Sequence, residues 1–341
     1  MALVFAVAVA AALSAVLTGL FIYLIVRKWR ENRRQARLRA YKEERRLPLL
    51  RYLLGEEELS FRFSSPLERE AVLQLLDSFA SLLKGEHVQT RLRAFAEAHF
   101  QGWLRHRLAS RQWSERMNAL FLIEDLQMKG MLPDIERLYR SAGVTEGETA
   151  KILAIFAKFD YRPVVTYVFQ PKYELTEFAY RIIFGHMSEQ LLQQVKKRFA
   201  ELPPAGKYAL IDMIGIRRRQ EGLFLEQLLA SEDLEIRVRA LKAMAEIGVP
   251  LGARQLERHL RSPHWQERLM AARLAGKYRE EKLLPLLCER LSDRSFAVRS
   301  EAAAAIARLP NGRAVLRTAA QHVDDRYARD MARQWLEEEE I

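Results

Sequence analysis

The sequence has 341 residues, of which 49% are hydrophobic and 29% are charged, a balance that excludes an intrinsically disordered chain. Its single cysteine excludes an intrachain disulfide. The formal net charge is +11, but residues 27–51 hold 11 Lys/Arg and three Asp/Glu, whereas the chain after them holds 44 basic and 41 acidic residues. Because the remainder is nearly neutral, a basic surface along the whole protein, as in a DNA-wrapping protein, is not indicated.

The first predicted element is the charge-free run at residues 2–26, ALVFAVAVAAALSAVLTGLFIYLIV. A helix of this length, rising 1.5 Å per residue, can cross a hydrocarbon core of about 30 Å. No basic region precedes the run, and it is longer than the apolar part of a signal peptide, so we predict an uncleaved transmembrane helix at residues 1–26. The basic residues after it predict a single-pass protein of the cell membrane, with the N-terminus outside and a cytoplasmic body.

Residues 27–51 are predicted to form a basic neck beside the membrane. In one interpretation the neck only sets the topology, and in another its cations also bind anionic lipid head groups. Binding of nucleic acid by the neck is a weaker alternative, because lipid phosphate would be the nearest anion. The residues proposed to contact head groups are Arg27, Lys28, Arg30, Arg33, Arg34 and Arg37.

A connecting loop and a pair of capping helices are predicted in residues 52–108. Ser65 followed by Pro66 is a helix-start signal, because Ser caps the first turn and Pro fits the first helical position. The helices are predicted over about 66–84 and 87–108. They would form a diverged first unit that closes one end of a repeat array.

From residue 109 to residue 341, a small residue returns in the middle of each predicted helix at intervals close to 30 residues. The series is Ala119, Ala150, Ala179, Ala209, Ala240, Ala271, Ala302 and Ala332. This period with two helices per unit predicts an α-solenoid, in which alanine lets neighbouring helices approach closely. The clearest units predict helices over 233–248, 251–261, 264–277, 280–291, 294–309 and 312–322. Ser262 with Pro263 is the predicted start of one of them.

The segment from Asp233 to Gly248, DLEIRVRALKAMAEIG, resembles the second-helix pattern of bacterial-type HEAT repeats, D-x-x-V-R-x-x-A followed by apolar residues and Gly. The match is clear over 225–341 and rests on spacing alone over 109–224. The resemblance implies an all-α protein, a right-handed α-α superhelix (a HEAT-like solenoid) preceded by the transmembrane helix.

In this family, the Asp and Arg of the pattern usually pair between adjacent units and brace the stack. The resemblance therefore implies a structural role for Arg237, Arg268 and Arg299. The alternative interpretation is a row of cations that binds a ligand.

Residues 155–184 are rich in aromatic side chains, with nine among thirty residues. They are interpreted either as a bulky core for units that lack the alanine-rich packing, or as a surface on which tyrosines anchor a partner, since Tyr is favoured at interface hot spots. The candidates for partner binding are Tyr161, Tyr167, Tyr173 and Tyr180.

The sequence contains no motif that indicates a catalytic, cofactor or metal site, and Cys288 lies in an apolar helical run. We therefore predict a non-enzymatic, membrane-anchored cytoplasmic scaffold or adaptor. Its partners would be membrane-associated proteins, and nucleic acid and small-molecule ligands are not expected. Two alternatives remain open, namely a HEAT-like enzyme of the lyase or glycosylase type, and a lipid or nucleic-acid binder that uses the basic neck.

Overall fold

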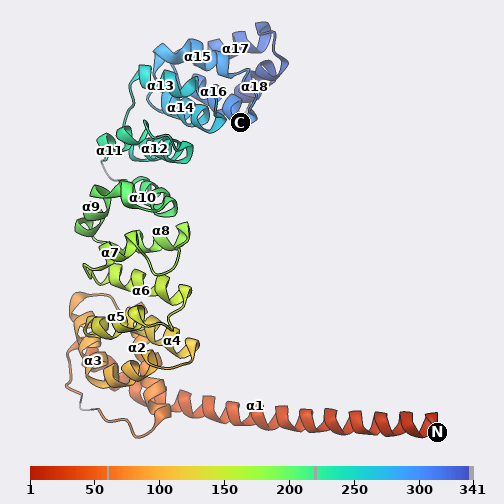
Figure 1. The fold of residues 1–341 in the computed structure, drawn as a ribbon, viewed down its shortest axis with the longest axis vertical. Coiled ribbons are helices and arrows are strands. Elements are labelled where there is room, and N and C mark those ends of the chain that lie inside the picture. The colour runs from red at the N-terminus through yellow and green to blue at the C-terminus, as the bar shows by residue number, and fades with distance from the viewer. Residues whose placement is uncertain (60, 219–220, 338–341) are drawn as a thin grey trace. The chain divides into compact units, whose positions relative to one another are not determined.

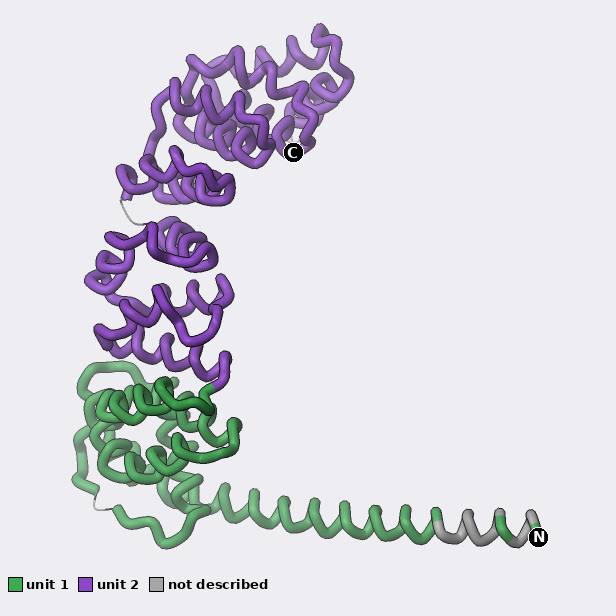
Figure 2. Tube along the Cα trace, viewed as in Figure 1, with its two compact units in different colours: residues 1–144 green, residues 145–341 purple. Residues whose placement is uncertain are grey.

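The computed structural model describes the chain except residues 60, 219–220 and 338–341, and the side chains of residues 2–4 and 6–12 are also outside the described part. The described residues form helices, turns and loops and no strand, which confirms the predicted all-α class for them. The chain divides into two compact units, residues 1–144 and 145–341 (Figures 1 and 2).

Unit 1 packs its helices around a core of leucine and phenylalanine side chains. Its elements are α1 (Ala2–Leu54), α2 (Pro66–Leu82), α3 (Glu86–Leu108), α4 (Trp113–Asp125), the short 3-10 helix η1 (Lys129–Met131) and α5 (Leu132–Arg140). Helices α2 and α3 confirm the predicted pair. The start of α2 is also as predicted, because the Ser65 hydroxyl accepts a hydrogen bond from the Glu68 N–H at 3.1 Å and Pro66 is the first helical residue.

The predicted neck is the C-terminal part of α1 and belongs to unit 1. Leu38, Leu49 and Leu53 are buried, and α1 contacts both α2 and α3. Arg45 donates a hydrogen bond of 3.0 Å from Nε to the carboxylate of Glu68, which is fully buried. Apolar burial and an ion pair therefore fix this half of α1 to the unit.

The prediction of a single-pass membrane protein is contradicted by the structure. In the described part of the chain, no helix is long and apolar enough to cross a membrane. Within the predicted span, the side chains of residues 13–26 are described, and they are exposed. The side chains of residues 2–4 and 6–12, also in that span, lie outside the described residues.

Unit 2 has two layers of helices, and each helix of the first layer contacts the next one along the chain. The first layer consists of α6 (Glu146–Lys158), α8 (Glu177–His186), α10 (Pro204–Ile216), α12 (Leu234–Ile247), α14 (Trp265–Lys277), α16 (Phe296–Ala307) and α18 (Arg326–Glu337). The second layer consists of α7 (Val164–Phe169), α9 (Glu189–Lys197), η2 (Phe199–Glu201), α11 (Gly222–Leu228), α13 (Ala253–Leu260), η3 (Glu281–Leu283), α15 (Leu284–Arg290) and α17 (Gly312–His322). This alternation is the arrangement that the repeat period predicts.

The small residues of the repeat series lie in the core, as predicted. Those that are fully buried are Ala119, Ala209, Ala240, Ala271, Ala302 and Ala332. Ala150 and Ala179 are half-buried. One predicted helix start is wrong, because α14 begins at Trp265 and not at Pro263. The Ser262 hydroxyl instead donates a hydrogen bond to the Glu267 carboxylate, so it is committed to that side chain.

Candidate functional site

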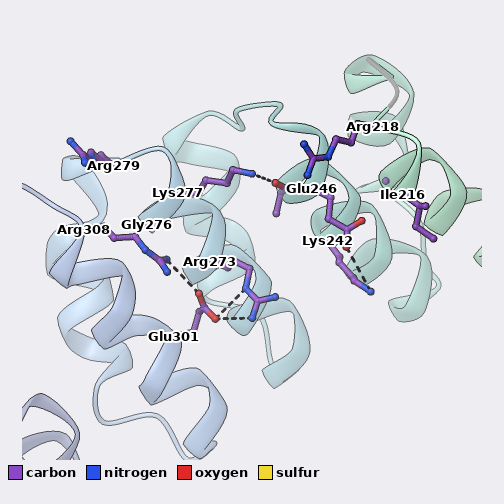
Figure 3. Close-up of a pocket in the computed structure, with 12 residues that line it drawn as sticks. Ile216, Arg218, Lys242, Glu246, Arg273, Gly276, Lys277, Arg279, Glu301 and Arg308 are labelled. Atoms are coloured by element: carbon purple, nitrogen blue, oxygen red, sulfur yellow. Dashed lines mark hydrogen bonds and ion pairs between the residues drawn. The ribbon is translucent and has the colours of Figure 1, made fainter. Parts of the chain in front are cut away.

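A groove of about 810 Å³ runs along the first layer of unit 2, where α10, α12, α14 and α16 reach their C-terminal ends (Figure 3). Its lining combines six basic side chains, two carboxylates and a few small or apolar residues. The basic residues are Arg218, Lys242, Arg273, Lys277, Arg279 and Arg308. The groove therefore carries an excess of positive charge.

Glycine residues bring the helices together at this groove. A Cβ atom on Gly276 of α14 would stand 2.6 Å from the Cα of Ala305 on α16, which is closer than side chains approach backbone. A Cβ atom on Gly215 of α10 would stand 3.3 Å from the Cα of Ala243 on α12. A larger residue at Gly276 would force α14 and α16 apart.

Two of the cations, Arg273 and Lys277, make contacts that hold neighbouring helices together, and Arg308 pairs with a carboxylate of α16. Arg273 on α14 donates to the Glu301 carboxylate on α16 at 2.8 Å, and Arg308 lies 3.8 Å from the same carboxylate. The Lys277 ammonium donates to the carbonyl oxygen of Ala245, near the C-terminal end of α12. Because the C-terminal end of a helix is its negative end, a cation is stabilised there. These three residues have structural reasons to be basic.

Arg218 and Arg279 differ from these three, since neither side chain has a hydrogen bond or ion pair with a described residue (Figure 3). Both are exposed and follow a first-layer helix, with φ angles of 49° and 52°. The turns after α12 and α16 have Gly248 and Asn311 in the same left-handed region. This conformation costs a residue with a Cβ roughly 1–2 kcal/mol, so the backbone does not favour arginine at these two positions.

The side chains that line the groove are mainly charged groups suited to binding. The described lining residues include no histidine, hydroxyl or thiol side chain, and no aromatic ring on which a nucleic-acid base could stack. Ile216 is 64% exposed and adds an apolar surface beside Arg218. Lys242 lies 3.9 Å from Glu246, and an exposed pair at this distance contributes little to stability. The groove is therefore suited to hold a negatively charged segment with some apolar character.

A second group of charges in the first layer is neutralised within the protein. Arg239 on α12 is paired with Glu177 on α8 at 2.8 Å and with Asp212 on α10 at 2.6 Å. It also pairs with Glu235, and Arg181 pairs with Asp212 at 3.0 Å. Burial raises the pKa of Asp212 above its usual value, although Arg239 and Arg181 act against that shift. This cluster joins three helices, and its two arginines are matched by three carboxylates, so it leaves no excess positive charge.

The arginines of the repeat pattern brace adjacent units, which confirms the structural interpretation for two of them. Arg237 donates from Nε to Glu267 at 2.6 Å, and Arg268 donates to Asp293 at 2.7 Å. In each pair the acid belongs to the next unit, and each arginine also donates to carbonyl oxygens five and six residues before it. Arg299 makes the same backbone hydrogen bonds.

The four tyrosines proposed to bind a partner do not share one exposed surface. Tyr180 is fully buried, and its hydroxyl donates to a backbone carbonyl of α7 at 2.9 Å, so its predicted partner contact is wrong. Tyr161 and Tyr167 are half-buried, with ring centres 4.8 and 6.1 Å from that of Phe156. Tyr173 is exposed. The aromatic segment is therefore mainly core, because its rings fill the space between helices.

The basic residues proposed to contact lipid head groups lie exposed on α1. Arg34 donates to Glu70 of α2 at 2.5 Å, and the Arg33 guanidinium lies 3.8 Å from the ring centre of Trp29. The head-group role depended on a neighbouring membrane span, and no described helix provides one. Contact of these residues with lipid head groups stays a prediction.

No group of three or more His, Cys, Asp or Glu side chains within the described residues is placed to hold a metal ion. Cys288 is half-buried, and burial raises the pKa of its thiol, which disfavours the reactive thiolate. His99 packs against the ring of Phe95, with centres 4.4 Å apart, and burial lowers its pKa. Both residues are explained by packing.

The family model for HEAT repeats matches residues 253–337, from the start of α13 to the end of α18. No curated protein matches the chain. Among solved structures, the crystal structure of an engineered protein is similar at 17% identity, over 85% of this chain and 77% of that one, with a TM-score of 0.28. A likeness at this score carries no argument, so the HEAT type is established for the matched residues by the family model.

Proposed function

We propose that the protein is a helical-repeat scaffold that binds a segment of a partner protein in the groove of unit 2. HEAT repeats over residues 253–337 support a scaffold, because repeat arrays present extended surfaces for protein contacts. We further propose that the same repeat continues upstream over 109–252, where helix pairs and the spacing of the alanines persist. The observation that carries the proposal is a groove lined by four successive first-layer helices, with two exposed arginines that no described residue neutralises.

Binding is proposed in preference to catalysis because of the side chains that line the groove. A lyase or glycosylase, the enzyme alternative, needs acid, base or nucleophilic groups that converge on a substrate. The two carboxylates of the groove, Glu246 and Glu301, lie beside lysine and arginine partners, with Glu301 engaged by Arg273. This arrangement favours an anion-binding surface.

Site-specific photo-crosslinking in the cells that produce the protein tests this function. A photoreactive amino acid replaces Ile216 in the groove of the full chain, and the matched control replaces Leu223 of α11, which is 81% exposed and does not line the groove. We expect a discrete protein adduct from position 216 and none from position 223. Adducts of equal yield at both positions, or no protein adduct at 216, would contradict the proposal.

A further inference from the structure

We infer that the segment bound in the groove is acidic and that Arg218 and Arg279 recognise its carboxylates. This inference rests on the proposed function, because it names the chemistry of the ligand in the same groove. Two independent features support it, namely the uncompensated charge of the groove and the backbone conformation of the two arginines.

The charge of the groove is complementary to an acidic segment. Six basic and two acidic side chains line it, and the internal contacts of Arg273, Lys277 and Arg308 leave the two turn arginines without a partner among the described residues. A guanidinium presents a planar pair of N–H donors that matches the two oxygens of a carboxylate. Arg218 follows α10 and Arg279 follows α14, so they flank the intervening α12. A ligand that contacts both must therefore extend across α12.

The backbone at these two positions is the second feature. With φ angles of 49° and 52°, Arg218 and Arg279 occupy a conformation that glycine adopts without steric cost, as Gly248 does in the equivalent turn after α12. A side chain kept in a conformation that disfavours it points to a functional demand on that side chain. Since neither guanidinium has a hydrogen bond or ion pair with a described residue, we assign this demand to a ligand.

The lining favours a peptide over a nucleic acid. The exposed Ile216 lies beside Arg218 and can contact an apolar side chain, and Glu246 would repel a continuous phosphate backbone. The lining also lacks aromatic rings for base stacking. We therefore assign the ligand as a peptide segment in which acidic residues alternate with apolar ones.

The test measures how the full chain binds a fluorescently labelled peptide of alternating Glu and Leu, by fluorescence anisotropy. We expect the R218G/R279G variant to bind about tenfold more weakly than the wild type, because two charge contacts are lost. We also expect wild-type binding to weaken as salt is added, because exposed charges are screened. The melting temperature of the variant should stay the same or rise by about 2 °C, because glycine relieves the left-handed strain. Weaker binding therefore cannot be attributed to unfolding.

Two control variants separate charge recognition from other effects. Q127G relieves the backbone strain of a left-handed residue, with φ 52°, that lies outside the groove. R326E changes the net charge of the protein at an exposed residue that also lies outside the groove. Both should bind the peptide as the wild type does. The inference is overturned if R218G/R279G binds as tightly as the wild type, or if the protein binds labelled single-stranded DNA more tightly than the peptide. If position 216 gives a protein adduct but the acidic peptide does not bind, this inference alone is overturned. If position 216 gives no adduct and the peptide does not bind, the proposed function is overturned as well.

Discussion

Arg237 and Glu267 form an ion pair across the boundary between two repeat units, with 2.6 Å between Nε and Oε1. Their side chains are 17% and 4% exposed. The same carboxylate accepts a hydrogen bond from the Ser262 hydroxyl and lies 3.3 Å from Nδ1 of His259. Glu267 is thus the centre of a polar network that joins α12, α13 and α14.

Removal of the cation from this pair should destabilise unit 2. In Arg237→Met the buried carboxylate of Glu267 loses its main counter-charge, and we expect the free energy of unfolding to fall by about 3 kcal/mol. Denaturation in urea measures the change. Arg261→Ala, which breaks an exposed pair with Glu257, is the control and should cost less than about 0.5 kcal/mol. Equal losses in the two variants would show that the buried network does not brace the units.

Acid should destabilise the protein in two steps, the first of which involves His259. Burial lowers the pKa of this imidazole below its ordinary value of 6.5, against the opposing effect of Glu267. Below pH 6.5 the unfolded chain therefore binds a proton more readily than the folded chain, so stability falls as the pH falls. His259→Asn should remove its part of this step, so that the melting temperature of the variant falls less from about pH 7 to pH 5 than that of the wild type; the remaining fall comes from His99, whose pKa burial also lowers. A wild-type melting temperature that does not fall over the same range would contradict the assignment.

The second step reflects the buried carboxylates. Burial by itself raises the pKa of Glu267 and Asp293, but hydrogen bonds and charge from Arg237 and Arg268, respectively, lower both below their ordinary values. Their stabilisation is present above the pKa of the unfolded chain and is lost as the pH falls through the lower folded pKa values. Below about pH 4.5 we therefore expect a further fall in melting temperature, and Arg268→Met should make it smaller. If the melting temperature of Arg268→Met falls at low pH as much as that of the wild type, the paired carboxylates are not the cause of the second step.

The close approach of α14 and α16 predicts an asymmetric response to two glycine substitutions. Gly276→Ala places a Cβ against the backbone of Ala305 and should cost about 1–3 kcal/mol of stability. Gly102→Ala, within α3 and with no atom within 4 Å of the new Cβ, should instead stabilise by about 0.5–1 kcal/mol. Thermal unfolding of both variants measures the difference. A stabilising Gly276→Ala would show that the helices can separate without cost.

The buried hydroxyl of Tyr180 should matter more than an exposed one. Tyr180→Phe leaves the carbonyl of Val168 without this donor and should cost about 1 kcal/mol. Tyr327→Phe, where the ring is 66% exposed, should change the stability by less than about 0.5 kcal/mol. If the two variants unfold alike, the hydroxyl of Tyr180 is not a structural contact.

The repeat helices could be predicted from the sequence because their signals are local. An apolar stripe at helical spacing and an alanine every 30 residues or so place α12, α14 and α16 within a few residues of their observed bounds. The role of Ser262 could not be predicted in this way. The serine–proline signal at Ser262 and Pro263 competes with a hydrogen bond to Glu267, which only the packed structure reveals.

The groove could not be predicted from the net charge of the sequence. Its cations come from separate helices, and acidic residues elsewhere in the chain offset them in the sum. Arg218 and Arg279 are 61 residues apart in the sequence. One usable signal was present, namely arginine in the turn where the neighbouring repeat has Gly248. The predicted membrane span is contradicted, because no helix in the described part of the chain is long and apolar enough to cross a membrane.

The way α1 joins unit 1 determines where the protein can be shortened. A fragment that starts after Arg51 would lack Leu38 and Leu49, uncover the apolar faces of α2 and α3, and leave Glu68 buried without Arg45. A fragment that starts at Arg27 keeps all of these contacts. For purification or crystallisation, the cut therefore belongs ahead of the basic stretch and not behind it, although the charge pattern alone marks both places as boundaries.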